Sequence, residues 1–345
     1  MTTPLFRLSS RLTDARDIAS KARAADVSGN PHEALVLYER AIAMIEAGPY
    51  DALLADLFRW KGTTHRDRGE TYLAQQHYER SLEIAIACDA TLSRAHALNC
   101  LGIIAQRRGD LERAAGFYSE AAIYATRAGE QQLSGMIGQN RGVLANIQGD
   151  HHVALARYTE SLVSFEAANN DEATSWVLNN IGMLHSAENR VDDADKAFAR
   201  GLALADCRGD KRMQGLIELN IAHHRLGLGD VASADQRIAR VLTLAAERGD
   251  SLQSAEAFKL RAQIEQQQGL LDAADATLRR ARDLAEKADD ALLVAEVLRV
   301  IADVADARGE RDRARSVLRQ SRESFRGLGA RRDMDHASAC LSLLN

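Results

Sequence analysis

Amide side chains recur at a fixed spacing in the middle of this sequence of 345 residues. Asn140, Asn180 and Asn220 follow one another at intervals of 40 residues. Three more amides accompany them, namely Asn99, Gln139 and Asn179. An amide offers both a donor and an acceptor, so it can pair with the N–H and C=O groups of a peptide backbone. The alternative is that these amides bond neighbouring helices and keep structural repeats in register.

Catalytic and metal-binding chemistry finds little support in the residue pattern. The usual phosphate-binding, dinucleotide-binding, zinc-protease and serine-hydrolase motifs do not occur in a fitting context. The adjacent pairs His151–His152 and His223–His224 would point about 100° apart on a helix, so neither pair can chelate one metal. The four cysteines form no CxxC pair and predict neither a zinc site nor a disulfide framework. We therefore expect no enzyme activity, no cofactor and no metal.

Charge and hydropathy argue against two further classes of protein. The chain has 44 basic and 49 acidic residues, a net charge of −5, which argues against general nucleic-acid binding. No run of 18 apolar residues occurs, so no membrane span is predicted. The N-terminal segment lacks the apolar core of a secretory signal. These features favour a protein of the cytoplasm.

A strict period of 40 residues defines the elements that must carry the amides. Turn-forming residues stand on this grid at Gly29, Gly69, Gly109, Gly149, Asn189, Gly229, Gly269 and Gly309. Asparagine replaces glycine once, and it is the next-best residue for a left-handed turn. A second set lies twenty residues further on, at Pro49, Asp89, Gly129, Asn169, Gly209, Gly249, Asp289 and Gly329. Each repeat is therefore two segments joined by a turn.

Three more columns keep the same phase. Five residues after each turn stands an alanine: Ala34, Ala74, Ala114, Ala154, Ala194, Ala234, Ala274 and Ala314. Nine after it stands a bulky apolar residue: Tyr38, Tyr78, Tyr118, Tyr158, Phe198, Ile238, Leu278 and Leu318. Seven before it stands a small one: Ala22, Gly62, Gly102, Gly142, Gly182, Ala222, Ala262 and Ala302. Small residues suit the crossing of two helices, and apolar residues inside each segment follow the helical period.

Capping residues support the same helical hairpins. Asp110, Asp150 and Asp230 directly follow their glycines, where a helix N-cap is expected. Pro31 falls at a first helical turn, which accommodates proline. No proline follows Pro49, so the rest of the chain can be helical.

These columns resemble the tetratricopeptide repeat, most clearly in residues 97–125 and 177–205. The usual repeat has 34 residues. The longer period resembles the subclass found in kinesin light chains, bacterial peptide-pheromone receptors and the sensor regions of bacterial transcription activators. The resemblance implies an all-α, right-handed superhelix, an α-solenoid of about eight helix-turn-helix repeats. It covers residues 11–329, with 1–10 as an N-terminal extension and 330–345 as a C-terminal capping helix.

In arrays of this family, the first helix of each hairpin lines a concave groove that holds a protein or peptide partner. The resemblance therefore places the six amides on a groove wall, as the related asparagine ladders are placed. Further candidates on the same wall are Arg59, Arg66, His96, Met183 and His223. For His96, Met183 and His223 the alternative is packing against the next repeat. For the arginines the alternative is a solvated helix face. Arg16, Arg23 and Arg107 add to the basic N-terminal part, which favours the acidic end of a peptide.

Three functions remain open at this point. The first is a non-catalytic scaffold or adaptor that binds a peptide or protein in its groove. The second is a regulatory sensor gated by a ligand or signal peptide, which acts on a separate effector in transcription or signalling. The third is a self-assembling structural protein with apolar ends, at Leu5, Phe6 and residues 341–344. The sequence gives neither the partner nor the oligomeric state.

Overall fold

The chain folds into helical hairpins throughout residues 4–328 and 330–344, the part that the computed structural model describes. Within that part no β-strand occurs, which confirms the predicted all-α class. The chain forms two compact units, Met1–Ala173 and Thr174–Asn345. The first unit contains α1 (Pro4–Val27), α2 (Pro31–Ile45), α3 (Ala52–Asp67), α4 (Thr71–Ala87), α5 (Thr91–Arg107), α6 (Leu111–Ala128), α7 (Gln131–Ile147) and α8 (His151–Ala167).

The second unit contains nearly all of α9 and every later helix. These are α9 (Asp171–Ala187), α10 (Val191–Arg208), α11 (Lys211–Gly227), α12 (Val231–Arg248), α13 (Ser251–Gln267), α14 (Leu271–Lys287), α15 (Ala291–Ala307), α16 (Arg311–Gly327) and α17 (Arg331–Leu343). Helix α1 begins inside the predicted extension 1–10, and α17 lies inside the predicted segment 330–345.

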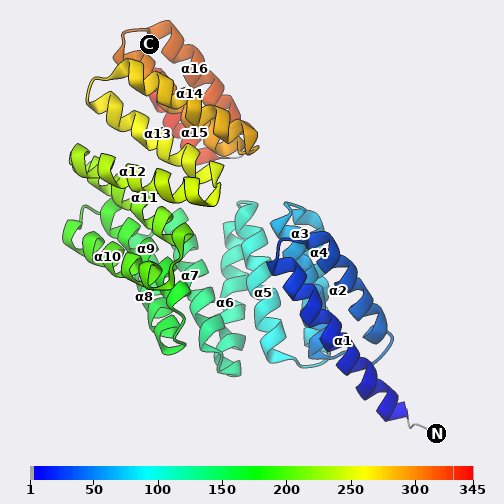
Figure 1. Cartoon of the computed structure of the whole chain (residues 1–345). Helices are drawn as coiled ribbons and strands as arrows, with labels where there is room; N and C mark the ends of the chain where they lie inside the picture. Colours follow the sequence, from blue (N-terminus) through cyan, green and yellow to red (C-terminus); the bar gives the residue numbers. More distant parts are fainter. Residues whose placement is uncertain (1–3, 329, 345) are drawn as a thin grey trace. The chain divides into compact units, whose positions relative to one another are not determined.

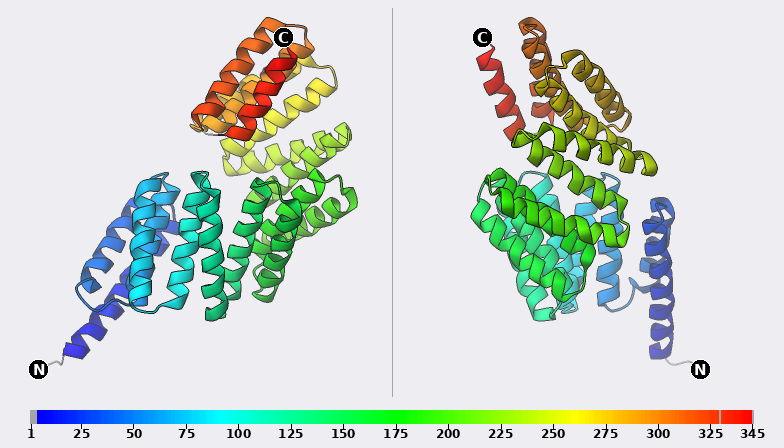
Figure 2. Two further views of the ribbon diagram at one scale, coloured as in Figure 1. Left: turned by 180° about the vertical axis from the view of Figure 1, so that it is seen from behind. Right: turned by 60° about the vertical axis from the view of Figure 1, so that its left-hand side comes forward.

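Within each unit, successive helices lie side by side (Figures 1 and 2). Helices α1 and α2, α3 and α4, α5 and α6, and α7 and α8 pack as hairpins, and so do the pairs from α11 to α16. First helices also touch their counterparts in the next hairpin, as α3 touches α5 and α13 touches α15. The predicted tetratricopeptide-type hairpins are confirmed.

The turns have the backbone conformation that the grid residues predict. Asn189 has a φ of 57°, in the left-handed region, like the 80° of Gly149. The carboxylates of Asp110 and Asp150 accept the backbone N–H of the residue three positions later at 3.2 and 3.1 Å. Asp230 caps α12 in the same way, at 3.1 Å. Local backbone chemistry therefore sets where each second helix begins. Gly329, the last turn residue of the grid, lies outside the described residues.

Glycines seven residues before a turn make room for the aromatic rings nine residues after it. A Cβ built on Gly142 would lie 2.5 Å from the Tyr158 ring, and one on Gly182 would lie 2.6 Å from Phe198. Where alanine replaces glycine, the partner is aliphatic, as in the buried pair Ala262 and Leu278. After Phe198, the volume lost when an aliphatic side chain replaces the ring is thus made up by the alanine that replaces the glycine of the same hairpin. Tyr38, opposite Ala22, is the exception.

Buried hydroxyl groups join the two helices of several hairpins. Ser161 of α8 donates to the carbonyl of Gly135 in α7 at 2.7 Å, and Ser321 of α16 donates to Ala295 in α15 at 2.8 Å. In the hairpin of α9 and α10 the direction reverses, because Ser175 of α9 donates to Gly201 of α10 at 2.8 Å. Such bonds satisfy the hydroxyl and fix the crossing of the helices.

Among the described residues, no helix combines the length and the apolar character that crossing a bilayer requires. The side chains of Leu5 and Phe6 lie outside the described residues.

Candidate functional site

The predicted site residues divide between the two units. The first unit holds Arg59, Arg66, His96, Asn99, Gln139 and Asn140, and the second holds Asn179, Asn180, Met183, Asn220 and His223. All of them lie on first helices, namely α3, α5 and α7 in one unit and α9 and α11 in the other.

Four of the amides form two equivalent pairs between neighbouring first helices. Asn140 Nδ2 donates to Asn99 Oδ1 at 2.9 Å, and Asn220 Nδ2 donates to Asn179 Oδ1 at 2.8 Å. Asn99 and Asn179 are each only 2% exposed. Asn140 and Asn220 are half-buried. Each bond therefore links two hairpins, and the outer amide of each pair keeps an oxygen atom that has no partner among the described residues.

The remaining amides and the two predicted arginines are less organised. Gln139 and Asn180 are half-buried, and their side-chain amides form no hydrogen bond within the described part of the chain. Arg59 pairs with Asp56 at 3.1 Å and Arg66 with Asp67 at 2.7 Å. Local carboxylates thus neutralise much of the positive charge expected on this face.

The second unit contains an open pocket of about 360 Å³ between α9, α10 and α11. Its lining residues are Met183, Ser186, Ala187, Phe198, Asn220 and His223. Asn220 reaches the pocket while its amide nitrogen stays bonded to Asn179. Met183 is 48% exposed and supplies flexible apolar surface. The pocket therefore joins an oriented amide to an apolar cavity.

No charged side chain lines this second-unit pocket at neutral pH. Desolvation lowers the pKa of His223 to about 4, and the nearby Lys259 ammonium adds to the shift. The imidazole is therefore neutral at pH 7. The hydroxyl of Ser186 bonds the Nδ1 of the buried His224 at 2.7 Å. A neutral, partly apolar ligand group fits these surroundings.

The first unit contains a larger pocket, of about 520 Å³, between α1, α2 and α3. It is lined by Arg23, Asp26, Val27, Gly29, Pro31, Tyr38, Trp60, Thr63, Thr64, Asp67 and Arg68. The guanidinium groups of Arg23 and Arg59 lie 5.0 and 5.4 Å from the centre of the Trp60 ring. Tyr38 stacks on Trp60 with 6.4 Å between ring centres. This pocket is therefore aromatic and charged.

The two pockets occupy the same positions of the repeat. Counted from the turn, the matched residues of the first and second unit are Arg23 and Met183, Asp26 and Ser186, Val27 and Ala187, Tyr38 and Phe198, Trp60 and Asn220, and Thr63 and His223. The repeat geometry thus supplies the cavity, and the local residues supply its chemistry. Sequence reasoning missed Asp26 and Ser186, three residues before their turns. These two residues lie one helical turn after Arg23 and Met183 on the same face of the helix, and that spacing is the sequence signal that indicates them.

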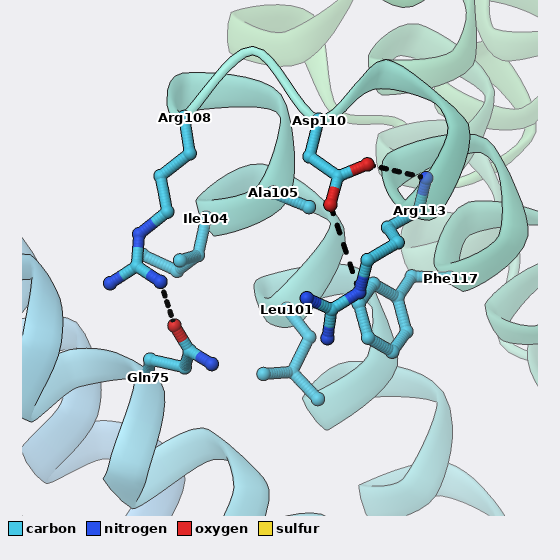
Figure 3. A pocket seen from close by; sticks show the side chains of 8 residues that line it. All are labelled: Gln75, Leu101, Ile104, Ala105, Arg108, Asp110, Arg113 and Phe117. Carbon is cyan, nitrogen blue, oxygen red and sulfur yellow. Dashed lines mark hydrogen bonds and ion pairs between the residues drawn. The ribbon is translucent and has the colours of Figure 1, made fainter.

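A third cavity, between α4 and the hairpin of α5 and α6, is too small for a ligand (Figure 3). Its volume of about 30 Å³ accommodates about one water molecule. Arg108 closes it by donating to Gln75, and Asp110 pairs with both the backbone and the side chain of Arg113 (Figure 3). The contact between Arg108 and Gln75 joins neighbouring hairpins, whereas the contacts between Asp110 and Arg113 are local to the start of α6. Among the described residues, no group of His, Cys, Asp and Glu is arranged to hold a metal ion.

Comparisons with known proteins agree with the hairpin architecture. The model of the tetratricopeptide repeat matches residues 136–206 and 253–327. No curated protein matches the chain by sequence.

Solved structures share the fold at low sequence identity. The apo form of RapI is 15% identical, with a TM-score of 0.64, over 80% of this chain and 99% of that one. The apo quorum sensor NprR from B. thuringiensis is 11% identical, with a TM-score of 0.63, over 96% and 99%. The Rap conjugation gene regulator of the plasmid pLS20, in complex with the Phr* peptide, is 16% identical, with a TM-score of 0.59, over 86% and 77%. At these identities the likeness shows the fold alone.

Proposed function

Because this chain is a tetratricopeptide-repeat protein, we propose that it binds an extended peptide along the first helices of its hairpins and is not itself a catalyst. The observation that carries the proposal is Asn220, held by Asn179 at the edge of a neutral pocket. An amide fixed before binding loses little further entropy when it pairs with a peptide backbone. A neighbouring apolar side chain of the peptide would then enter the pocket beside Met183 and Phe198.

The amide pairs support this proposal without excluding a structural role. The inner members, Asn99 and Asn179, are buried and keep neighbouring hairpins in register. The outer members, Asn140 and Asn220, are half-buried and offer a carbonyl oxygen to a ligand. One residue pair can therefore serve both purposes. The Rap conjugation regulator, which shares the fold, was solved with a bound peptide.

A random heptapeptide library displayed on phage and selected on the full chain tests this function. We expect enriched peptides to bind the purified protein, and Asn220→Ala to weaken binding about fivefold, the effect of losing one net hydrogen bond of about 1 kcal/mol. The triple variant N140A/N180A/N220A should lose several times more. Gln236→Ala, which removes an exposed amide from α12, is the matched control.

Two outcomes would contradict the proposal. One is that no peptide is enriched above the background of the support. The other is that selected peptides bind the folded triple variant as tightly as the wild type. The variant Asn179→Ala separates the structural role of the amide pair from ligand contact. We expect it to lower the free energy of unfolding by more than it lowers the free energy of peptide binding.

A regulatory role is the second candidate, because two proteins that share the fold are described as a quorum sensor and a conjugation gene regulator. Under this candidate, the peptide changes the helix arrangement and alters a separate effector. Small-angle scattering of the chain with and without a selected peptide would detect that change, and identical curves would leave a static scaffold or adaptor.

The four free cysteines accord with a cytoplasmic setting.

Self-association is the third candidate, and the exposed apolar side chain of Leu343 favours it. Light scattering over a hundredfold range of concentration would reveal a rising mass if this surface joins copies of the chain. A constant monomer mass would remove the candidate.

A further inference from the structure

We propose that the pocket of the first unit, which Arg23 and Trp60 line, binds a carboxylate joined to an apolar group, such as the C-terminal residue of a peptide. This inference does not rest on the peptide contact proposed for Asn220. The two pockets belong to different units, and each can be occupied or empty on its own.

The charges around this pocket single out Arg23. Arg68 donates to Glu70 at 3.0 Å, and Asp67 accepts from Arg66 at 2.8 Å. No carboxylate in the described part of the chain forms an ion pair with Arg23, whose guanidinium lies over the Trp60 ring. A stacked guanidinium keeps its N–H edge available for two parallel bonds to a carboxylate. Arg23 is therefore the cation in this pocket that is open to an anion.

The one carboxylate of the pocket that lacks a cationic partner is already engaged. Asp26 Oδ2 accepts the hydroxyl of Thr64 at 2.8 Å, which turns this carboxylate toward α3. Burial, with a smaller contribution from Asp26, raises the pKa of Tyr38 to about 12, so the phenol stays neutral. Neither group prevents an anion from approaching Arg23 on the face of the indole.

The rest of the pocket suits an aliphatic or aromatic side chain. Trp60, Pro31 and Val27 supply apolar surface, and Val27 is 88% exposed. A volume of about 520 Å³ exceeds the need of one leucine-sized group and leaves room for the start of a peptide chain. The ligand chemistry is thus a carboxylate at Arg23 and an apolar group against Trp60. A free organic acid and a peptide C-terminus both carry it.

Tryptophan fluorescence can follow each pocket separately, because the chain contains only two tryptophans. In the full-length variant Trp176→Phe, the remaining indole is Trp60. We expect N-acetyl-leucine to change its emission saturably, with an affinity on the order of millimolar. The neutral N-acetyl-leucine amide should bind at least about tenfold more weakly, and the cationic leucine amide more weakly still.

A fourth probe distinguishes the two sources of the carboxylate. The peptide N-acetyl-Gly-Gly-Gly-Leu presents the same end as N-acetyl-leucine on a longer chain. Equal or tighter binding of this peptide identifies the pocket as a site for chain ends. Binding of N-acetyl-leucine alone identifies a site for small organic acids. Either result supports the shared chemistry.

Two variants of α1 complete the test. Arg23→Gln should weaken N-acetyl-leucine about tenfold and remove the preference over its amide. Arg11→Gln makes the same change in net charge at an exposed position of the same helix and should have no effect. The proposal is overturned if acid and amide bind equally, if the cationic probe binds best, if both variants weaken binding alike, or if no saturable change occurs.

The function proposed for the second unit has its own reporter. In the variant Trp60→Phe, Trp176 of α9 is the remaining tryptophan, and it packs against the buried cluster that contains Phe198, a residue of the second-unit pocket. If a selected peptide changes the emission of Trp176 while N-acetyl-leucine leaves that of Trp60 unchanged, the first-unit site is contradicted and the peptide-binding function is supported. If N-acetyl-leucine changes the emission of Trp60 while no selected peptide changes that of Trp176, the first-unit site is supported and the peptide contact at Asn220 is contradicted.

Discussion

The hairpins α7/α8 and α13/α14 bring the same two columns of the repeat together but fill them with different residues. In α7/α8, Gly142 accepts the ring of Tyr158, and a Cβ there would come within 2.5 Å of the ring. In α13/α14, Ala262 stands against Leu278, and both residues are fully buried. Compared with α7/α8, the pair in α13/α14 has one more methyl group on its first helix, and on its second helix a branched aliphatic side chain replaces the ring. The two pairs therefore fill the crossing with a similar combined volume although they have no residue type in common.

The largest expected effect on stability comes from truncating the bulky side chain that fills the crossing of the two helices. Tyr158→Ala should lower the free energy of unfolding by about 3–5 kcal/mol, and Leu278→Ala by about 2–5 kcal/mol. We expect the first loss to be the larger of the two, because Gly142 has no side chain that could relax into the cavity. Urea denaturation followed by circular dichroism measures both. A smaller loss for Tyr158→Ala would show that the two hairpins are not equivalent in the way described.

An intermediate effect is expected from filling the space that the ring occupies. Gly142→Ala should destabilise the chain by about 1–2 kcal/mol, since the overpacking exceeds the gain in helix propensity. The double variant G142A/Y158L recreates the pair of α13/α14 and should recover most of the loss. Melting curves of the single and double variants provide the measurement.

A glycine without neighbours supplies the control for this substitution. Gly116 lies in α6 with no heavy atom within 4 Å of an added Cβ. Gly116→Ala should therefore stabilise the chain, by up to about 1 kcal/mol. If both alanine variants shift the melting temperature in the same direction, the clash with Tyr158 does not control the crossing.

The smallest effect concerns one buried position that is aliphatic in one hairpin and ionisable in another. Leu144 stands five residues before its turn in α7, and His224 stands at the matching position in α11. Burial lowers the pKa of His224, and the carboxylate of Asp195 opposes the shift only in part, with Arg225 adding to it. Below about pH 6.5 the unfolded chain takes up a proton that the folded chain resists. Stability should therefore fall as the pH falls.

The variant His224→Leu sharpens this last comparison. It copies the residue of α7 and should flatten the dependence of stability on pH below about pH 6.5. A single group contributes at most about 1.4 kcal/mol per pH unit. Unfolding midpoints at several pH values would show the flattening, and an unchanged slope would assign the dependence to other histidines.

The fold was predictable because its rules act over short distances along the chain. The left-handed conformation of Asn189 and the caps formed by Asp110 and Asp150 involve residues at most three positions apart. The site was predictable only in outline. The sequence placed Asn140 and Asn220 on first helices, but it did not show that Asn99 and Asn179 are buried as their partners.

The sequence alone determined the period, the turns and the volume filling each crossing, because these follow from backbone conformation and side-chain size at fixed spacing. Only the tertiary structure decided which polar groups remain open to a ligand. Asn140 bonds Asn99, 41 residues away along the chain, and Arg23 meets the ring of Trp60, 37 residues away. Pairing of this kind depends on which side chains of neighbouring hairpins meet in space, and a periodic pattern does not specify it.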